Sequence, residues 1–331
     1  MQDIEKQLSN IYGINIESLH NYKNNCVAET QFGKKIIKRM SISPERILFI
    51  HGAKEHLYSN NFNNLDRYIC TKEGNPYACI DGFYYTMTDL KNGRECNFDL
   101  REDVIKASKT LAGLHCASKG YVSPKESIKR SDLGKLPEYY KKRLNEIKRV
   151  KKLAQRERSK FDYLILKYID YFYEIGKDSL NKIYTSKYNE LVDKARKEKN
   201  FCHHDYSYCN IICDGEKMSI INFDYCSYEL KVYDVANFLR RKMRKCYWNI
   251  EEAKTIIDSY TSIESISDNE FMILYIMLQF PHKFWRVINK YYNSRRTWRE
   301  KKILIKYQEV IDEIEHHKNF LSEFKALFLS G

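Results

Sequence analysis

The hydrophobic pattern of this 331-residue chain changes near Gly93, and this change restricts the folds that it can adopt. Before Gly93, short β-type segments occur in pairs around turn sequences, with one helix between the pairs. Ser43-Pro44-Glu45 has the residues of a helix start, so a helix is predicted from Pro44 to about Ser59. The β segments are 27–30 and 34–39, which flank Gln31-Phe32-Gly33, and 77–80 and 83–88, which flank Asp81-Gly82.

After Gly93, apolar residues recur at helical spacing over long stretches, beginning with residues 99–118. Similar stripes in 161–172 and 304–324 are typical of helices that face a core rather than of cofactor-binding segments. We therefore predict an α+β fold of two lobes. Its parts are a β-rich N-terminal lobe at 1–85, a hinge at 86–92, and a helical C-terminal lobe at 93–331 that contains a strand-rich hairpin at 201–224.

Composition excludes several classes of protein. Hydrophobic residues make up 43% of the chain and charged residues 31%, values of a globular protein rather than a disordered one. The longest apolar run, residues 271–280, is about half of what a membrane-spanning helix needs. The N-terminus carries Asp3 and Glu5 where a signal peptide would be basic, so we expect a soluble, non-secreted protein. Ten cysteines without a Cys-x-x-Cys pair indicate free thiols in a reducing cytoplasm.

Much of the net charge of +13 falls in one predicted helix, because residues 141–160 hold ten Lys or Arg and two Glu. Leu144, Ile147 and Val150 lie on its opposite face. Three interpretations are open: a solvated amphipathic surface, a surface for an acidic macromolecule, and a nucleic-acid-binding surface. The first is favoured, because basic charge alone is not sufficient for nucleic-acid binding and no nucleic-acid motif accompanies it.

The strand-rich hairpin carries the residues with the clearest chemistry. His203-x-Asp205 is followed by Asn210, then by a strand, a turn at Asp214-Gly215, a second strand at 218–221 and Asn222-Phe223-Asp224. Phosphoryl transfer needs a carboxylate for the acceptor hydroxyl and oxygen ligands for Mg²⁺, and kinase-type catalytic loops supply such a pair five residues apart. The alternative is that these side chains only hydrogen-bond a tight turn.

These motifs resemble the aminoglycoside/choline kinase-like superfamily, and more narrowly the CotS-type spore coat proteins of endospore-forming bacteria. The most specific matching segments are Leu111-Ala112-Gly113-Leu114-His115, Cys202-His203-His204-Asp205-Tyr206, and Phe223-Asp224-Tyr225 before Tyr233-Asp234-Val235-Ala236. The resemblance covers most of the chain and implies a bilobal protein-kinase-like fold, with ATP and Mg²⁺ as cofactors if the protein is active and no cofactor otherwise.

Carried over to this sequence, the resemblance makes Asp205, with His203 in the same motif, the catalytic candidate. It makes Asn210 a Mg²⁺ ligand and Lys38 the strand lysine on the nucleotide phosphates. Glu55 is expected to pair with Lys38, although Glu45 on the same predicted helix is an alternative. In the hinge, the resemblance assigns cofactor binding to Met87 and Asp89.

The sequence departs from the superfamily pattern at two places. Asn222 stands where the superfamily generally has the metal-binding aspartate, so the site loses a negative charge and its affinity for Mg²⁺ is expected to fall. Asp224 is a candidate to compensate, because residues two apart on a strand share a face. In addition, residues 20–33 contain no Gly-x-Gly-x-x-Gly phosphate loop.

Three functions are consistent with these features. The resemblance implies a spore coat protein that acts in coat assembly or structure, with other coat proteins as partners, and Asn222 favours this function. The implied location is the cytoplasm of the mother cell and then the spore coat, with no membrane association. The second is an active ATP-dependent phosphotransferase with a small-molecule or sugar acceptor. The third, a basic nucleic-acid-binding protein, rests on charge alone. The aromatic-rich stretch from Phe280 to Trp298 is expected to be core packing rather than a cage for a cationic acceptor.

Overall fold

The computed structural model describes residues 2–157, 159–293 and 300–329. Within them the chain forms two compact units. The first contains residues up to Ser131, Glu198–Tyr228 and Ser262–Glu264, and the second contains Asp132–Lys197, Glu229–Thr261 and the residues from Ser265 onward. Both predicted lobe boundaries, at residues 85 and 93, fall inside the first unit, so the division into lobes stays a prediction.

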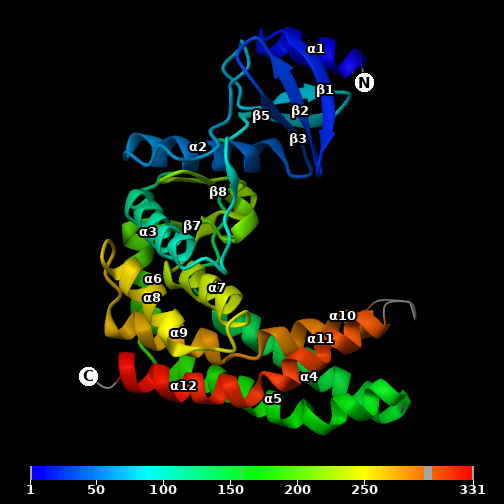
Figure 1. The fold of residues 1–331 in the computed structure, drawn as a ribbon, viewed down its shortest axis with the longest axis vertical. Coiled ribbons are helices and arrows are strands. Elements are labelled where there is room, and N and C mark those ends of the chain that lie inside the picture. Colours follow the sequence, from blue (N-terminus) through cyan, green and yellow to red (C-terminus); the bar gives the residue numbers. More distant parts are fainter. Residues whose placement is uncertain (1, 158, 294–299, 330–331) are drawn as a thin grey trace. The chain divides into compact units, whose positions relative to one another are not determined.

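A five-stranded antiparallel sheet is the largest β element of the first unit (Figure 1). Its order is β1 (Ile16–Tyr22), β2 (Asn25–Thr30), β3 (Lys35–Met40), β5 (Phe83–Asp89) and β4 (Ala78–Ile80). The last four confirm the predicted strand pairs, whereas β1 and the preceding α1 (Gln2–Tyr12) had no prediction. Residues Leu8, Ile14, Ala28, Ile37 and Met87 bury one face of the sheet against α1. The other face is therefore available for a site.

The predicted helix is α2 (Pro44–Ser59), which lies in Figure 1 between this sheet and the remaining strands of the unit. Those strands form two small sheets: β6 (Arg94–Glu95), β8 (Ile211–Asp214) and β9 (Lys217–Ile220) in one, and β7 (Phe201–Cys202) with β10 (Ser227–Tyr228) in the other. The helix α3 (Arg101–Ser118) packs against both α2 and β7. The predicted strand-rich hairpin is thus built from β7, β8 and β9.

The second unit is helical. Its longest helices, α4 (Leu136–Glu157) and α5 (Lys160–Thr185), lie side by side in Figure 1, and they share their largest interface with each other. Leu144, Ile147 and Val150 of α4 are buried, as the amphipathic pattern predicts, and most of its Lys and Arg residues are exposed. The other helices are α6 (Tyr188–Glu198), α7 (Val232–Met243), α8 (Ile250–Thr261), α9 (Asp268–Gln279), α10 (His282–Asn293), α11 (Glu300–Asp312) and α12 (Ile314–Phe328).

Aromatic side chains form much of the core of this unit. Phe280 stacks on Tyr140 with ring centroids 3.7 Å apart, and Phe284 stacks on Phe172 at 4.1 Å. These contacts agree with the expectation of core packing for the aromatic-rich stretch, although its last member, Trp298, lies outside the described residues.

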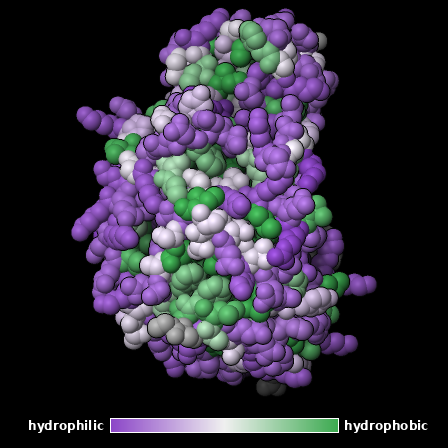
Figure 2. Space-filling view, turned by 60° about the vertical axis from the view of Figure 1, so that its left-hand side comes forward, coloured by the Kyte–Doolittle hydropathy of each residue, from purple (hydrophilic) through white to green (hydrophobic). Residues whose placement is uncertain are grey.

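The surface of the protein and the state of its cysteines agree with what the composition predicts. The face drawn in Figure 2 is mostly hydrophilic, with smaller apolar patches. Among the described residues, no helix has the length and apolar character to cross a bilayer. All ten cysteines are free thiols.

Glu229, in the second unit, is buried near Asp132 and Asp234. Burial raises its pKa from 4.5 to about 8, and the two neighbouring acids raise it further against the pull of Lys135. Because the folded pKa lies above the unfolded one, the protonated carboxyl stabilises the fold fully below pH 4.5, and this contribution is lost as the pH rises through about 8.

We predict that Glu229→Gln flattens this part of the pH profile of stability. The free energy of unfolding of the wild type should fall relative to the variant, by on the order of 1 kcal/mol per pH unit between pH 5 and 8, because one proton is released. Urea unfolding of both proteins at several pH values measures this difference. Parallel profiles would contradict the assignment.

Candidate nucleotide site

The register of one hairpin brings the predicted site residues together. In β8 and β9, Ile211 pairs with Ile220, and the backbone NH of Ile221 donates to the carbonyl of Asn210 at 3.0 Å. Asn210, just before β8, therefore lies opposite Ile221 and next to Asn222, just after β9. The sequence separation of twelve residues is closed by the tight turn at Gly215, whose φ is +58°.

Asn210 connects the catalytic candidate to the metal candidates. Its side-chain NH₂ donates to both the backbone carbonyl and a carboxylate oxygen of Asp205, each at 2.9 Å. Its side-chain oxygen accepts a longer contact, 3.4 Å, from the NH₂ of Asn222. Asn210 is buried, so these contacts determine the orientation of its amide and of the Asp205 carboxylate.

His203 braces this loop from behind. The side chain is fully buried, its Nδ1 accepts from the backbone NH of Asp205 at 3.2 Å, and its Nε2 donates to the carbonyl of Ile221 at 3.0 Å. Since Nδ1 is an acceptor, the proton of the neutral ring is on Nε2. Because the His203 side chain has no exposed surface, whereas Asp205 is partly exposed, the role of His203 here is to position Asp205 rather than to touch a substrate.

Lys38 faces the cavity because side chains alternate along β3, with Ile37 in the sheet core and Ile36 and Lys38 on the opposite face. The Lys38 ammonium donates to the side-chain oxygen of Asn222 at 2.8 Å and forms an ion pair with the carboxylate of Asp224. The structure thus joins Asp205, Asn210, Asn222, Lys38 and Asp224 in one chain of contacts.

Asn222 has a left-handed backbone, with φ +67° and ψ +64°. Among residues with a side chain, Asn and Asp adopt this conformation most readily, so the position accepts either of them. The backbone NH of Asn222 donates to the carboxylate of Asp66 at 3.0 Å. A change from amide to carboxylate at this position therefore needs no change of backbone.

The expected pair of Glu55 with Lys38 is wrong. Glu55 instead binds Arg67 through two hydrogen bonds of 2.9 and 2.5 Å, and Glu45, the alternative, is exposed at the start of α2. The residue of α2 that points inward is Lys54, because one step along a helix turns the side chain by about 100°. The helix therefore presents a lysine to the site in place of the expected glutamate.

Lys54 is 1% exposed, and its ammonium contacts Asp66 through the backbone carbonyl at 2.7 Å and the carboxylate at 2.9 Å. It also lies 3.9 Å from the centroid of the Tyr68 ring. Burial lowers the pKa of Lys54, while the charges of Asp66 and Asp224 oppose this shift. Lys54 and Asp66 are functional candidates that sequence analysis missed, because adjacent Lys54 and Glu55 give no sign of which one faces inward.

Lys38, Lys54 and Asn222 line a cavity of about 640 Å³. This volume is in the range of small-molecule sites. Its walls include Asp66, Asn210, Asn222 and Asp224, and the turn between β1 and β2 at Lys23 and Asn24 also lines it. This turn contains no glycine. Lys23 forms an ion pair with Glu95, another residue of the wall.

The two predicted hinge residues differ in their access to the cavity. Asp89 lines the cavity, where it pairs with Lys35, but Met87 does not: its side chain is fully buried in the sheet core and its carbonyl accepts from the NH of Ile69. The side chain of Met87 therefore does not reach the cavity, and its assignment to cofactor binding stays a prediction. Thr86 and Thr88, on either side of it, line the cavity instead.

The oxygen donors of this site have the right chemistry for a divalent cation. Asn210, Asn222 and Asp224 offer amide and carboxylate oxygens, the hard ligands that Mg²⁺ prefers. However, the set contains a single carboxylate, and the Lys38 ammonium already contacts both Asn222 and Asp224. A metal would compete with this ammonium for the same oxygens.

We predict that the buried pair, and not the exposed one, stabilises this region. Lys54→Met should lower the free energy of unfolding by about 3 kcal/mol, because Asp66 loses its partner ammonium away from water. Glu55→Gln should cost less than about 1 kcal/mol, since the Glu55–Arg67 pair is partly exposed to solvent. Urea unfolding of the two variants makes the comparison, and equal losses would contradict it.

The chain is similar to known proteins in both sequence and structure. Residues 5–324 match the family described as "Spore coat putative kinase YutH". Spore coat protein S of Bacillus subtilis (strain 168) is 28% identical over 304 residues, which cover 91% of this chain and 86% of that protein.

Among solved structures, an aminoglycoside phosphotransferase from Alicyclobacillus acidocaldarius subsp. acidocaldarius DSM 446 has a TM-score of 0.87 at 21% identity, over 98% of this chain and 96% of that one. The AMP-bound spectinomycin phosphotransferase has a TM-score of 0.66 at 16% identity, over 96% and 97% of the two chains. These similarities confirm the predicted kinase-like fold. The match over nearly the whole length shows that the chain belongs to the YutH family of spore coat kinase-like proteins.

Proposed function

We propose that this protein acts in the assembly or structure of the spore coat, and that its kinase-like site has a weakened affinity for Mg²⁺·ATP. The observation that carries this proposal is the contact of the Lys38 ammonium with Asn222 and Asp224. An amide replaces a carboxylate where the cation and the phosphates would meet, and an ammonium of the protein itself takes up the remaining negative charge.

The partners and the cellular location that we propose for this protein rest on its family. The similarity to spore coat protein S supports association with the coat. We propose other coat proteins as the partners, with synthesis in the mother-cell cytoplasm followed by deposition on the spore. Immunolocalisation in sporulating cells tests this proposal, and a signal confined to vegetative cytosol would contradict it.

An active phosphotransferase is the second candidate, and the contact between Asp205 and Asn210 favours it. The Asp205 carboxylate is oriented by Asn210 and by the loop that His203 braces, as a group that accepts a proton from an acceptor hydroxyl must be. Lys38 and Lys54 line the cavity with positive charge suited to phosphates. Mg²⁺, if bound by Asn210, Asn222 and Asp224, would supply charge neutralisation for the polyphosphate.

Similar structures support nucleotide as the ligand class. The spectinomycin phosphotransferase was solved with AMP, and an amicoumacin kinase, with a TM-score of 0.56 at 14% identity, was solved with AMP-PNP and Ca²⁺. We propose ATP and Mg²⁺ as the cofactors of an active form of this chain, and a small molecule or sugar as its acceptor.

Restoring the carboxylate should strengthen metal-dependent binding. We expect Asn222→Asp to tighten Mg²⁺-dependent binding of ATP by about tenfold or more, because it adds a negative charge at the cation without a backbone change. Calorimetric titration with and without Mg²⁺ measures the effect. Asn61→Asp is the matched control, since Asn61 also has a left-handed backbone but is exposed on the surface.

The outcomes separate the two candidates. Weak binding by the wild type that improves only in Asn222→Asp supports a weakened site. Tight Mg²⁺·ATP binding by the wild type that is lost in Asp224→Ala would show that Asp224 serves as the metal ligand, and the active phosphotransferase would then be preferred. Absence of nucleotide binding by every variant would leave a kinase-shaped scaffold that acts through its coat contacts.

Asp205→Asn addresses catalysis separately from binding. We expect this variant to lower any turnover of ATP with a panel of aminoglycosides, amino alcohols and sugars by about 10²–10⁴-fold, because the carboxylate acts on the acceptor hydroxyl. Nucleotide affinity should change little, since Asp205 does not line the nucleotide cavity. An equal loss of affinity would show instead that Asp205 holds the loop in shape.

A further inference from the structure

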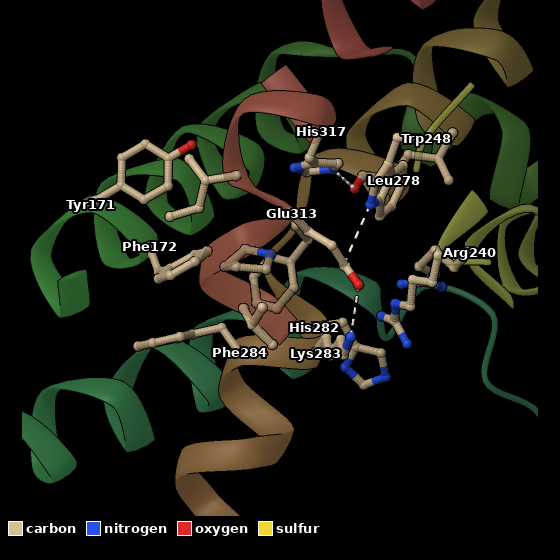
Figure 3. Close-up of a pocket in the computed structure, with 15 residues that line it drawn as sticks. Tyr171, Phe172, Arg240, Trp248, Leu278, His282, Lys283, Phe284, Glu313 and His317 are labelled. Atoms are coloured by element: carbon tan, nitrogen blue, oxygen red, sulfur yellow. Dashed lines mark hydrogen bonds and ion pairs between the residues drawn. The ribbon is translucent and has the colours of Figure 1, made fainter. Parts of the chain in front are cut away.

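The second unit contains a separate, smaller cavity whose mostly apolar and aromatic lining includes several cationic side chains (Figure 3). Its volume is about 50 Å³, and it lies among side chains from α5, α7, α9 and α10 and from the segment around α12. Arg240, Arg244 and Lys283 line it, together with His282 and one carboxylate, Glu313. None of these residues belongs to the candidate nucleotide site.

Glu313, the single carboxylate of the lining, already has two hydrogen-bond donors as partners. Glu313 accepts from the Lys283 ammonium at 2.8 Å and from the indole NH of Trp248 at 3.4 Å, the two dashed contacts at the centre of Figure 3. The cavity is therefore left with the charges of Arg240 and Arg244.

Neither arginine has an ion pair with a carboxylate among the described residues. Arg240 donates only to uncharged oxygens, the carbonyls of Ala236 and Met277 and the side chain of Asn237. The Nε of Arg244 is buried and has no hydrogen-bond partner in the described part of the chain. Burial lowers the pKa of Arg244 to about 10, and the neighbouring Arg240 lowers it further against the attraction of Glu313.

His282 adds a second buried donor. Its Nε2 lies 3.3 Å from the guanidinium of Arg286, which can only donate, so Nε2 is the acceptor and the proton of the neutral ring is on Nδ1. That Nδ1 is buried without a hydrogen-bond partner among the described residues. In Figure 3 the His282 ring lies beside the Arg240 guanidinium. Burial and the charges of Arg240, Arg143, Arg286 and Arg244 lower the pKa of His282, so the ring stays neutral.

These features are suited to the binding of an anion. An unsatisfied buried donor costs about 1–3 kcal/mol, and the guanidinium groups also repel one another. Water would satisfy the donors but would leave the charges uncompensated. An oxyanion does both, and guanidinium groups match the oxygens of phosphate especially well.

The size of the cavity limits the ligand. One water needs about 10–15 Å³ of such space, so the cavity holds a group of about four oxygen-sized atoms rather than a nucleotide. We propose that this cavity binds a phosphate group, held by Arg240, Arg244 and the Nδ1–H of His282. The phosphate is either free inorganic phosphate or the terminal group of a phosphorylated molecule.

Tryptophan fluorescence of the full chain, titrated with inorganic phosphate at constant ionic strength, tests this site. Trp248 lines the cavity, and Trp285 stacks on His282 with ring centroids 5.4 Å apart, so binding should change the emission. We expect Arg244→Gln to weaken phosphate binding at least tenfold. Arg196→Gln removes the same charge from an exposed pair with Asp193 in the same unit and should change binding less than twofold.

The melting temperature in phosphate-free buffer distinguishes a role of Arg244 in phosphate binding from a role in the stability of the fold. Because the Arg244 side chain has no hydrogen-bond partner at Nε and faces other cations, Arg244→Gln should melt at or above the wild-type temperature in phosphate-free buffer. The wild type and Arg196→Gln should then gain stability when phosphate is added, and Arg244→Gln should gain less. Arg244→Lys, which keeps the charge but loses the planar fork, should bind with intermediate affinity.

Phosphoserine peptides identify the source of the phosphate. Binding more than tenfold tighter than inorganic phosphate assigns the site to a phosphorylated partner, and equal affinity assigns it to free phosphate. A wild type without a saturable response, or an equal loss in Arg244→Gln and Arg196→Gln, would overturn the proposal, because phosphate would then act only as a diffuse counterion.

Discussion

The contact of the Lys38 ammonium with Asn222 and Asp224 is the interaction on which the candidate site depends. It joins β3 of the five-stranded sheet to the end of the strand-rich hairpin, two segments separated by more than 180 residues. Each partner is needed in its place, because an ammonium that is partly shielded from water is stable only beside oxygen acceptors. The contact therefore stabilises the fold and determines the charge that a ligand would meet.

The surrounding charges form a nearly balanced set. Lys54 is buried on Asp66, and Asp66 also accepts from the backbone NH of Asn222, so the two lysine–aspartate pairs meet at the residue that departs from the superfamily pattern. In the pattern that the sequence implied, a glutamate of the helix would hold the strand lysine and leave the carboxylates for a metal. Here the lysine is held by the metal candidates themselves. This exchange of partners is the physical reason why a weakened metal site is consistent with an intact fold.

In the cavity of the second unit, by contrast, the arginine charges are not paired with a carboxylate of the described residues. Among the described residues, Arg240 donates to neutral acceptors and the Nε of Arg244 has no hydrogen-bond partner, while the one carboxylate of the lining is taken by Lys283 and Trp248. A site whose charges are paired internally can persist without a ligand, whereas a site with unpaired buried donors is stabilised by one. The two cavities thus differ in how much each gains from an anion.

Much of the local structure and several of the residues that meet at the candidate site could be predicted from the sequence. Turn residues and alternation located β2 to β5, the helix start at Ser43-Pro44 located α2, and the spacing of Asp205, Asn210 and Asn222 predicted that one hairpin would bring them together. These features depend on near neighbours in the chain, where periodicity and turn chemistry decide. The resemblance placed Glu55 beside Lys38, but both Glu55 and Lys54 fit the helix, and only the packing of α2 decides which one is buried. No pattern in the sequence indicated the arginine cavity, because its members come from helices far apart in sequence. Burial and the pairing of charges over long sequence distances are properties of the tertiary structure, and they alone decided which partner each lysine and arginine has.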